Sequence, residues 1–166
     1  MVGIINTLFL SVNRVLFVLL FVALLGCAQN QYTWDDLTQE GELVYLNNNM
    51  TLFSGTVVNH KNEEWVYEGG SLKYYRIYFE NGQLCRHVIP IDARNSLTYE
   101  EEWTEKGELW RKVHYKGDEK HGAYKDYYPS GSLHWEGNYE EGEKVGIWKL
   151  YYESGQLEGE INFKYN

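Results

Sequence analysis

GAYKDYYPSG (residues 122–131) recurs as GIWKLYYESG (residues 146–155), 24 residues further along the chain. The two segments share both flanking glycines, the lysine, the Tyr-Tyr pair and the serine. The residues before them agree as well, since YKGDEKHG (residues 115–122) aligns with YEEGEKVG (residues 139–146) at the same offset. Similarity at a fixed interval is the sequence signature of a repeat architecture. The chain is therefore predicted to consist of tandem copies of one small unit.

Four glycines mark the same point in successive units. They are spaced 25, 24 and 24 residues apart, and each is followed two residues later by leucine: Gly82 and Leu84, Gly107 and Leu109, Gly131 and Leu133, Gly155 and Leu157. YRIYFENGQL (residues 75–84) is the earliest copy that fits this frame. The Asn-Gly and Ser-Gly pairs supply the positive-φ residue that tight hairpin turns need. Each of these glycines is predicted to close a β-hairpin.

Aromatic and aliphatic residues occupy alternate positions on both sides of these turns. The best-preserved runs are Tyr124-Asp126-Tyr128, Leu133-Trp135-Gly137-Tyr139, Trp148-Leu150-Tyr152 and Leu157-Gly159-Ile161-Phe163. A period of two indicates strands with one buried face. A lone hairpin is marginal in water, whereas stacked hairpins bury a continuous aromatic stripe. The predicted fold class is all-β, an elongated single-layer antiparallel sheet of tandem β-hairpin repeats.

One unit departs from this frame. Before Gly107 the aromatic alternation is Tyr99-Glu101-Trp103, one residue out of step with the later units. The 25-residue spacing supplies an extra residue, which we predict as a bulge or a longer turn near Glu105-Lys106. Pro90 is predicted to mark a loop or a sheet edge between two units.

The chain is acidic, with a formal charge of −9 from 24 acidic and 15 basic residues. Nucleic acids and anionic lipids attract clusters of Lys and Arg, so no nucleic acid partner is expected. The longest acidic run, Glu100-Glu101-Glu102, is interpreted as a solvated strand face, with a cation site as the alternative.

The first 27 residues form a different kind of segment. Residues 15–25 are an uninterrupted apolar run after Arg14, and as a helix they rise only about 16 Å, short of the roughly 30 Å hydrocarbon core. This length favours the apolar region of a signal peptide over a membrane span. A longer anchor helix, interrupted by Asn13-Arg14, is the alternative. LLGC (residues 24–27) resembles a bacterial lipobox, which implies cleavage before Cys27 and a lipid on its thiol.

The predicted organisation is a lipoprotein signal peptide (residues 1–26), a lipidated N-terminus and tether (residues 27–39) and the repeats (residues 40–166). Two or more acyl chains on Cys27 give stable anchoring, so the membrane is a predicted partner. Ala28 after the lipidated cysteine favours the outer membrane if the host has two. Cys85 is the only other cysteine, so a disulfide framework is not expected.

No set of side chains has catalytic or metal-binding spacing. The five histidines are scattered through different units, and none forms a His-x-x-x-His pair or pairs with a nearby cysteine in metal-ligand spacing. No Gly-x-Ser-x-Gly context or phosphate-binding glycine loop is present. The chain is predicted to be non-enzymatic, without cofactor, metal site or small-molecule substrate.

Four tyrosines fall on the strand face opposite the aromatic stripe, namely Tyr74, Tyr78, Tyr127 and Tyr151. A sheet face lined by repeated tyrosines can hold a sugar, a peptide or another protein. Alternatively, the rings only cover one another along the ladder. These four residues are the candidate binding residues.

ENGQL (residues 80–84), GIWKLYYESGQL (residues 146–157) and LFSGTV (residues 52–57) are similar to the MORN-repeat variant of bacterial proteins in the YwqK antitoxin-like family. The resemblance covers roughly residues 40–166 and is best from Tyr75 onwards. It implies an elongated, twisted, single-layer antiparallel sheet and, as one functional expectation, an antitoxin.

The leading functional prediction is a non-enzymatic envelope lipoprotein whose hairpin array serves as a protein-binding scaffold. An immunity protein that neutralises a partner toxin is the alternative. Direct binding to a membrane surface is a third, which the acidic composition disfavours.

Overall fold

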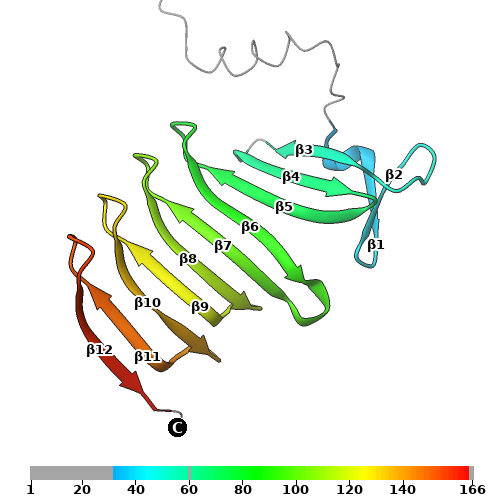
Figure 1. The fold of residues 1–166 in the computed structure, drawn as a ribbon. Coiled ribbons are helices and arrows are strands. Elements are labelled where there is room, and N and C mark those ends of the chain that lie inside the picture. Colours follow the sequence, from blue (N-terminus) through cyan, green and yellow to red (C-terminus); the bar gives the residue numbers. More distant parts are fainter. Residues whose placement is uncertain (1–31, 60, 165–166) are drawn as a thin grey trace, which may run out of the picture. The chain divides into compact units, whose positions relative to one another are not determined.

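The computed structural model describes residues 32–59 and 61–164, and almost all of its elements are β-strands (Figure 1). Ten strands form one open sheet in the order β12 to β3, so every strand pairs with its neighbours in the sequence. All of these pairings are antiparallel. The predicted all-β sheet of tandem hairpins is confirmed.

The elements follow one another without long connections. The large sheet contains β3 (Gly55–Asn59), β4 (Glu63–Glu68), β5 (Ser71–Tyr78), β6 (Leu84–Asp92), β7 (Leu97–Trp103), β8 (Leu109–Lys116), β9 (Glu119–Tyr127), β10 (Leu133–Glu140), β11 (Glu143–Tyr151) and β12 (Leu157–Phe163). A separate two-stranded sheet contains β1 (Leu37–Glu40) and β2 (Leu43–Leu46). The short 3-10 helices are η2 (Trp34–Asp36) and η3 (Ala93–Asn95). Within the described ranges, no helix combines the length and the apolar character needed to cross a bilayer.

The four predicted hairpin turns share one geometry and lie along one rim of the sheet (Figure 1). In the β9–β10 turn, the Gly131 amide donates to the Tyr128 carbonyl at 2.8 Å, and the Tyr128 amide donates to the Ser132 carbonyl at 2.9 Å. The φ angles of the four turn glycines are 82°, 83°, 85° and 86°. Glycine adopts this conformation without steric cost, which confirms the turns predicted from its spacing.

The prediction of a bulge or longer turn near Glu105-Lys106 is wrong. The Gly107 amide donates to the Thr104 carbonyl at 2.9 Å, as at the equivalent turns. The longer connection of this unit lies at the opposite rim, where residues 93–96 join β6 to β7. Two residues are enough at the equivalent β8–β9 and β10–β11 connections. As a result, Glu100 and Tyr124 occupy equivalent positions in successive units, and both lie opposite Val113 of β8.

Pro90 lies inside β6, opposite Thr98 of β7, and not in a loop. It is located beyond Val88, where the pairing of β6 with β5 stops. This side of β6 is therefore a local sheet edge, where proline removes no ladder hydrogen bond.

One row of side chains crosses the large sheet on a single face, from β3 to β11. Successive partners in this row are Val57, Trp65, Tyr75, Val88, Glu100, Val113, Tyr124 and Gly137, and the ring of Trp148 packs against Gly137. Most of these side chains are buried. We call this side of the sheet the ring face. Its apolar residues form two clusters, one on β3–β5 and one on β8–β12.

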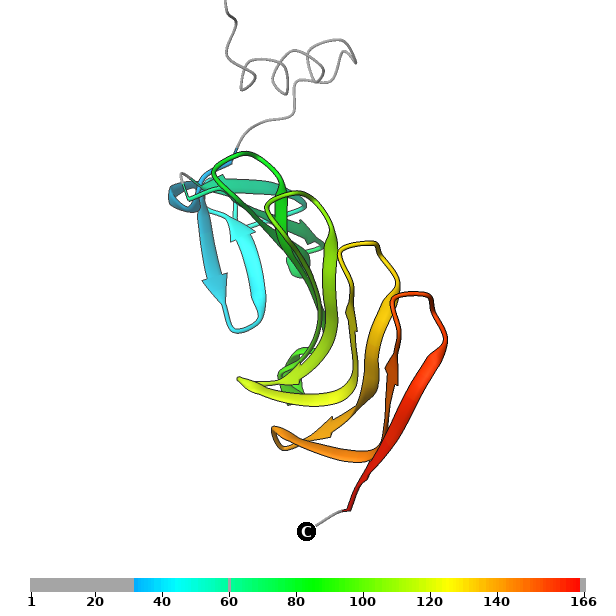
Figure 2. The same cartoon turned by 90° about the vertical axis from the view of Figure 1, so that its left-hand side faces the viewer.

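The β1–β2 hairpin covers the first of these clusters, in which Val44 packs with Phe53, Val57 and Tyr67. Figure 2 shows that this hairpin lies on the concave side of the curved large sheet. Tyr32 forms a bridge with Val57, and Leu37 also packs against the cluster. The folded body thus includes residues 32–39, which belong to the predicted lipidated N-terminus and tether (residues 27–39). The predicted signal peptide and Cys27 lie outside the described residues.

Candidate functional site

The second cluster of the ring face is organised around Trp148 of β11. The ring of Trp148 lies 5.0 Å from Tyr139, 5.5 Å from Tyr124 and 6.2 Å from Phe163 between ring centroids. Its indole Nε1 donates to the Asn138 carbonyl at 3.1 Å, and only 1% of the residue is exposed. The rings of four strands therefore pack into a small core, and no element of residues 32–59 and 61–164 forms a second layer over it.

Two lysines cover these rings from the solvent side. The Lys144 ammonium lies 4.2 Å from the centroid of Trp148, and the Lys120 ammonium lies 5.0 Å from that of Tyr139 and 5.3 Å from that of Tyr124. A lysine above an aromatic face gains cation–π attraction while its stem covers apolar surface. Within residues 32–59 and 61–164, neither lysine forms an ion pair. Burial lowers the pKa of Lys120 from its ordinary value, and the nearby Arg111 adds to this effect.

A row of alternating charges borders the rings. Arg111 donates from Nη2 to Glu102 Oε1 at 2.8 Å, and its Nε lies 2.8 Å from Glu102 Oε2. Next in the row, Asp126 accepts from the Tyr124 hydroxyl and from the Trp135 amide, both at 3.1 Å. Burial raises the pKa of Tyr124, and the charge of Asp126 raises it further. Ion pairs and hydrogen bonds within the sheet thus hold the charged side chains beside the cluster, although the buried Arg111 Nε has no hydrogen-bond partner among the described residues.

The interpretation of Glu100-Glu101-Glu102 as a solvated strand face is wrong. Glu100 is 9% exposed and Glu102 is 7% exposed, and both lie on the ring face. The register of β7 turns them inward, where the cations on either side are Arg86, 3.7 Å from Glu100, and Arg111. Burial raises the pKa of Glu100 from its ordinary value. These carboxylates replace rings in the middle of the sheet.

The opposite side of the sheet carries a row of charged residues, and we call it the charged face. Its members pair in succession from β4 to β12: Glu64, Arg76, His87, Glu101, Lys112, Lys125, Glu136, Lys149 and Glu160. Lys112 lies 3.0 Å from Glu101, and Lys125 lies 3.1 Å from Glu136. Unlike the two lysines of the ring face, these lysines already have carboxylate partners.

The four candidate tyrosines are half-buried, and the structure does not bring them together. Tyr74 and Tyr78 lie on β5, Tyr127 on β9 and Tyr151 on β11. The Tyr78 hydroxyl donates to Glu64 at 2.9 Å.

Two further contacts hold Tyr151 and Tyr74 within the charged face. The Tyr151 hydroxyl donates to Glu136 at 2.7 Å, and the Arg76 guanidinium lies 4.5 Å from the ring of Tyr74. These contacts join Tyr74, Tyr78 and Tyr151 to the charged row. Their role in binding stays a prediction.

The described part of the chain contains few other side chains that could react or bind a metal. Cys27 lies outside it, and Cys85 is a half-buried free thiol whose pKa is raised by burial. No group of three or more potential metal ligands occurs there.

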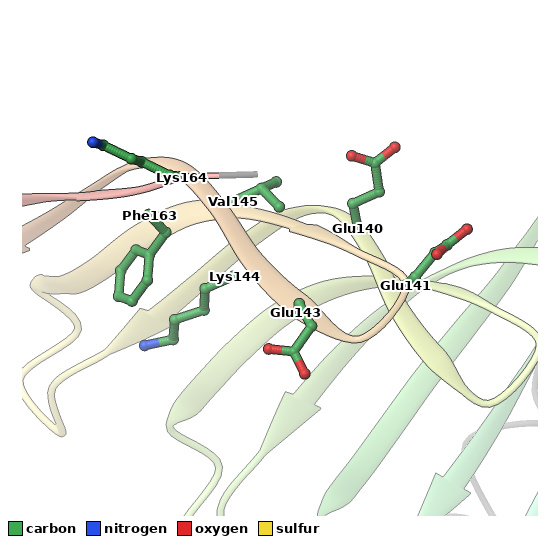
Figure 3. A pocket seen from close by; sticks show the side chains of 7 residues that line it. All are labelled: Glu140, Glu141, Glu143, Lys144, Val145, Phe163 and Lys164. Carbon is green, nitrogen blue, oxygen red and sulfur yellow. The ribbon is translucent and has the colours of Figure 1, made fainter. Parts of the chain in front are cut away.

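The hollow at the β10–β11 hairpin has a volume of about 610 Å³ and is partly open to solvent (Figure 3). It is lined by Glu140, Glu141, Glu143, Lys144, Val145, Phe163 and Lys164. Figure 3 shows Lys144 and Phe163 on one side of the hairpin and Glu140 and Val145 on the other.

Sequence reasoning missed Lys120 and Lys144 as members of the ring face. Both occupy the same phase of the two-residue alternation as Tyr124 and Trp148, and they are 24 residues apart. A cation that recurs at the repeat interval on the aromatic phase is the signal that identifies them.

Comparison with known proteins identifies the repeats at the C-terminal end of the sheet. Residues 120–141 and residues 144–165 each match the family described as a MORN repeat variant. No curated protein matches the chain. A solved structure with partial similarity is the crystal structure of an S. aureus TarM mutant in complex with Fondaparinux, alpha-GlcNAc-glycerol and UDP. The TM-score is 0.40 and the identity 11%, over 58% of this chain and 19% of that chain.

Proposed function

Given two MORN repeat variants in β9–β12, we propose that the protein is a non-enzymatic scaffold that binds another protein on the ring face of β8–β12. The observation that carries this proposal is the difference between the two clusters of the ring face. The β1–β2 hairpin packs on the first cluster, whereas no described element packs on the rings of the second. A partner protein supplies the missing layer.

The composition of this surface supports a protein partner. Aromatic side chains and long cationic ones are enriched at protein interfaces, where they offer large contact areas with a polar tip. Trp135, Tyr139 and Phe163 are half-buried, so each of these residues keeps some exposed surface. Ile161 is 48% exposed at the border of the cluster. Carboxylates of a partner can pair with Lys120 and Lys144, which form no ion pair among the described residues.

Paired double substitutions test the proposed surface. Lys120→Gln with Lys144→Gln removes two charges from the ring face, and Lys125→Gln with Lys149→Gln removes two from the charged face of the same two strands. A partner purified with the wild-type chain is expected to bind the ring-face variant on the order of tenfold more weakly, as two interfacial ion pairs are lost. The charged-face variant is expected to bind like the wild type. Equal binding by both variants would exclude the ring face, and thermal unfolding of each variant controls for folding.

We further propose that Cys27 carries a lipid that attaches this scaffold to the cell envelope. The support is the lipobox-like LLGC (residues 24–27) after an apolar run. Intact mass of the membrane-extracted protein is expected to show loss of residues 1–26 and a gain of acyl mass, both abolished by Cys27→Ala. A mature chain without acyl mass would contradict the lipid anchor and leave the binding surface unaffected.

A further inference from the structure

The β1–β2 hairpin shows what kind of segment fits the ring face. Leu37 and Leu46 are cross-strand partners, and Val44 lies on the same side of the hairpin because side chains alternate along a strand. All three side chains pack on the first cluster. The apolar side of a two-stranded hairpin therefore covers aromatic rings of this sheet.

This covering hairpin is acidic. Glu40 and Glu42 lie on either side of its Gly41 turn, and Asp35 and Asp36 precede it. The sequence from residue 32 to residue 59 contains no lysine or arginine. The hairpin thus combines an apolar side with carboxylates at its turn.

The two lysines of the second cluster lie where the turn of a similar hairpin would come. Lys120 is the second residue of β9 and Lys144 is the second residue of β11, so both lie toward the rim opposite the four glycine turns. In Figures 1 and 2 the turn of the β1–β2 hairpin points away from those glycine turns. A hairpin docked in this orientation on the second cluster places its apolar side over Tyr139 and Trp148 and its turn near the lysines.

The spacing of these lysines suits two carboxylates on neighbouring strands. Lys120 lies over Tyr139 and Lys144 lies over Trp148, and the centroids of these two rings are 5.0 Å apart. Side chains that face each other across a hairpin are separated by about 4.5–5.5 Å at their Cβ atoms. Two carboxylates at such positions repel each other in a free hairpin, and two ammonium groups beneath them remove that repulsion. A basic hairpin would be repelled by both lysines and by the nearby Arg111.

We propose that the partner of the ring face of β8–β12 presents an acidic β-hairpin, with apolar side chains on one side and a carboxylate on each strand next to its turn. The apolar side packs on the second cluster as β1–β2 packs on the first, and the two carboxylates pair with Lys120 and Lys144. This inference rests on the proposed protein-binding function, to which it adds the form and the charge of the partner's segment.

Carbodiimide cross-linking of the purified complex tests the form of this segment, because the reagent joins an amine only to a carboxylate in direct contact with it. Lys120 and Lys144 are both expected to be joined to Asp or Glu residues that flank one turn of the partner, in a segment whose apolar residues alternate with a period of two. Attachment to a segment whose apolar residues recur every three or four positions, or to two distant segments, would overturn the hairpin. The weaker binding of Lys120→Gln with Lys144→Gln would still stand in that case, so the ring face and the hairpin are tested separately.

A synthetic copy of the chain's own hairpin provides a probe of known sequence. Residues 37–46 (LTQEGELVYL) are closed head to tail through D-Pro-Gly, which forms a second tight hairpin turn. The probe is mixed with the full-length chain, which is kept in nonionic detergent because of its apolar residues 15–25. The matched control is a linear peptide of the same ten residues in scrambled order.

The glutamates of the closed peptide are expected to cross-link to Lys120 and Lys144 on the order of tenfold more than to Lys125 and Lys149 of the charged face. The scrambled peptide is expected to lose this preference, because it has no apolar side to place on the rings. Equal yields on the two faces, or equal yields from the two peptides, would overturn the proposal.

Discussion

Gly137 is the residue at which the second cluster has no space for a side chain. A Cβ built there would lie 2.3 Å from the ring of Trp148. The glycine thus lets a large ring lie flat across β10. Gly159, also on the ring face, has no heavy atom within 4 Å of the same built Cβ. The two strand glycines differ in the space around them and not in backbone strain.

Gly137→Ala is expected to destabilise the protein by about 3 kcal/mol, because the added methyl forces Trp148 out of its position. Gly159→Ala is the matched control and is expected to be neutral or slightly stabilising, since alanine restricts the unfolded chain. Thermal or chemical unfolding of the two variants measures the difference. Similar stabilities would contradict the close packing described for Trp148.

Glu100 and Glu136 are two carboxylates with opposite dependence on pH. Burial raises the pKa of Glu100, so its protonated form stabilises the fold below the ordinary pKa of about 4.3, and this contribution is lost as the pH rises through the raised value. A hydrogen bond from Tyr151 lowers the pKa of Glu136, so its ionised form stabilises the fold at neutral pH, and this is lost on acidification.

Glu100→Gln is therefore expected to raise the unfolding temperature at pH 7 by a few degrees, with a difference from the wild type that shrinks below about pH 4. Glu136→Gln is expected to lower it at pH 7, with a difference that also shrinks in acid. Unfolding temperatures measured across this pH range check both signs. A loss of stability in Glu100→Gln at pH 7 would show that Arg86 fully compensates the buried charge.

The hairpin turn is the element that the repeat preserves most closely. At Gly131 the φ angle is 85°, and no heavy atom lies within 4 Å of a built Cβ. Any loss of stability caused by a substitution at Gly131 therefore comes from the backbone conformation alone. Among other residues, asparagine adopts this left-handed conformation most readily.

Gly131→Ala is expected to cost about 1 kcal/mol of unfolding free energy, because the Cβ disfavours the left-handed region. Gly131→Asn is expected to cost clearly less. Chemical denaturation of the two variants provides the comparison. If alanine were as well tolerated as asparagine, the turn would have to adopt a different conformation in solution.

Strand β7 shows how one connection changes the face that a strand presents. Residues 93–96 lengthen the link from β6, while the following turn keeps the common geometry. Tyr99 consequently donates to Glu101 at 2.8 Å on the charged face, and burial together with this contact raises the pKa of Tyr99 to about 12. Because side chains alternate with a period of two, a slip of one residue moves a whole strand's apolar set to the other face.

In the molecule as a whole, two apolar clusters lie on one sheet, with Val88 and the carboxylates of β7 between them. The first cluster contains Val44 and Phe53 and receives the β1–β2 hairpin. The second contains Trp148 and Tyr124 on β8–β12. In repeat proteins each unit contacts only its neighbours, so a local loss of stability remains local.

Trp148→Ala is expected to cost about 4 kcal/mol and to speed amide hydrogen exchange in β9–β12 while β1–β5 keep their protection. Phe53→Ala is the reciprocal control and is expected to expose β1–β5 first. Exchange measured by mass spectrometry distinguishes the two patterns. A uniform increase over all strands in both variants would show that the sheet unfolds as a single cooperative unit.

The amino-acid sequence by itself determined the hairpins, their tight turns and their order in the sheet. Period-two alternation and a turn glycine such as Gly131 act within a few residues, and a near-constant interval of 24 residues stacks each unit on its neighbour. Tertiary structure alone decided the burial of Glu100, the position of Lys144 over Trp148 and the packing of β1–β2 on the first cluster. These features depend on strand register, which the length of a connection sets, and on contacts between segments distant in the chain. Local patterns carry neither kind of information.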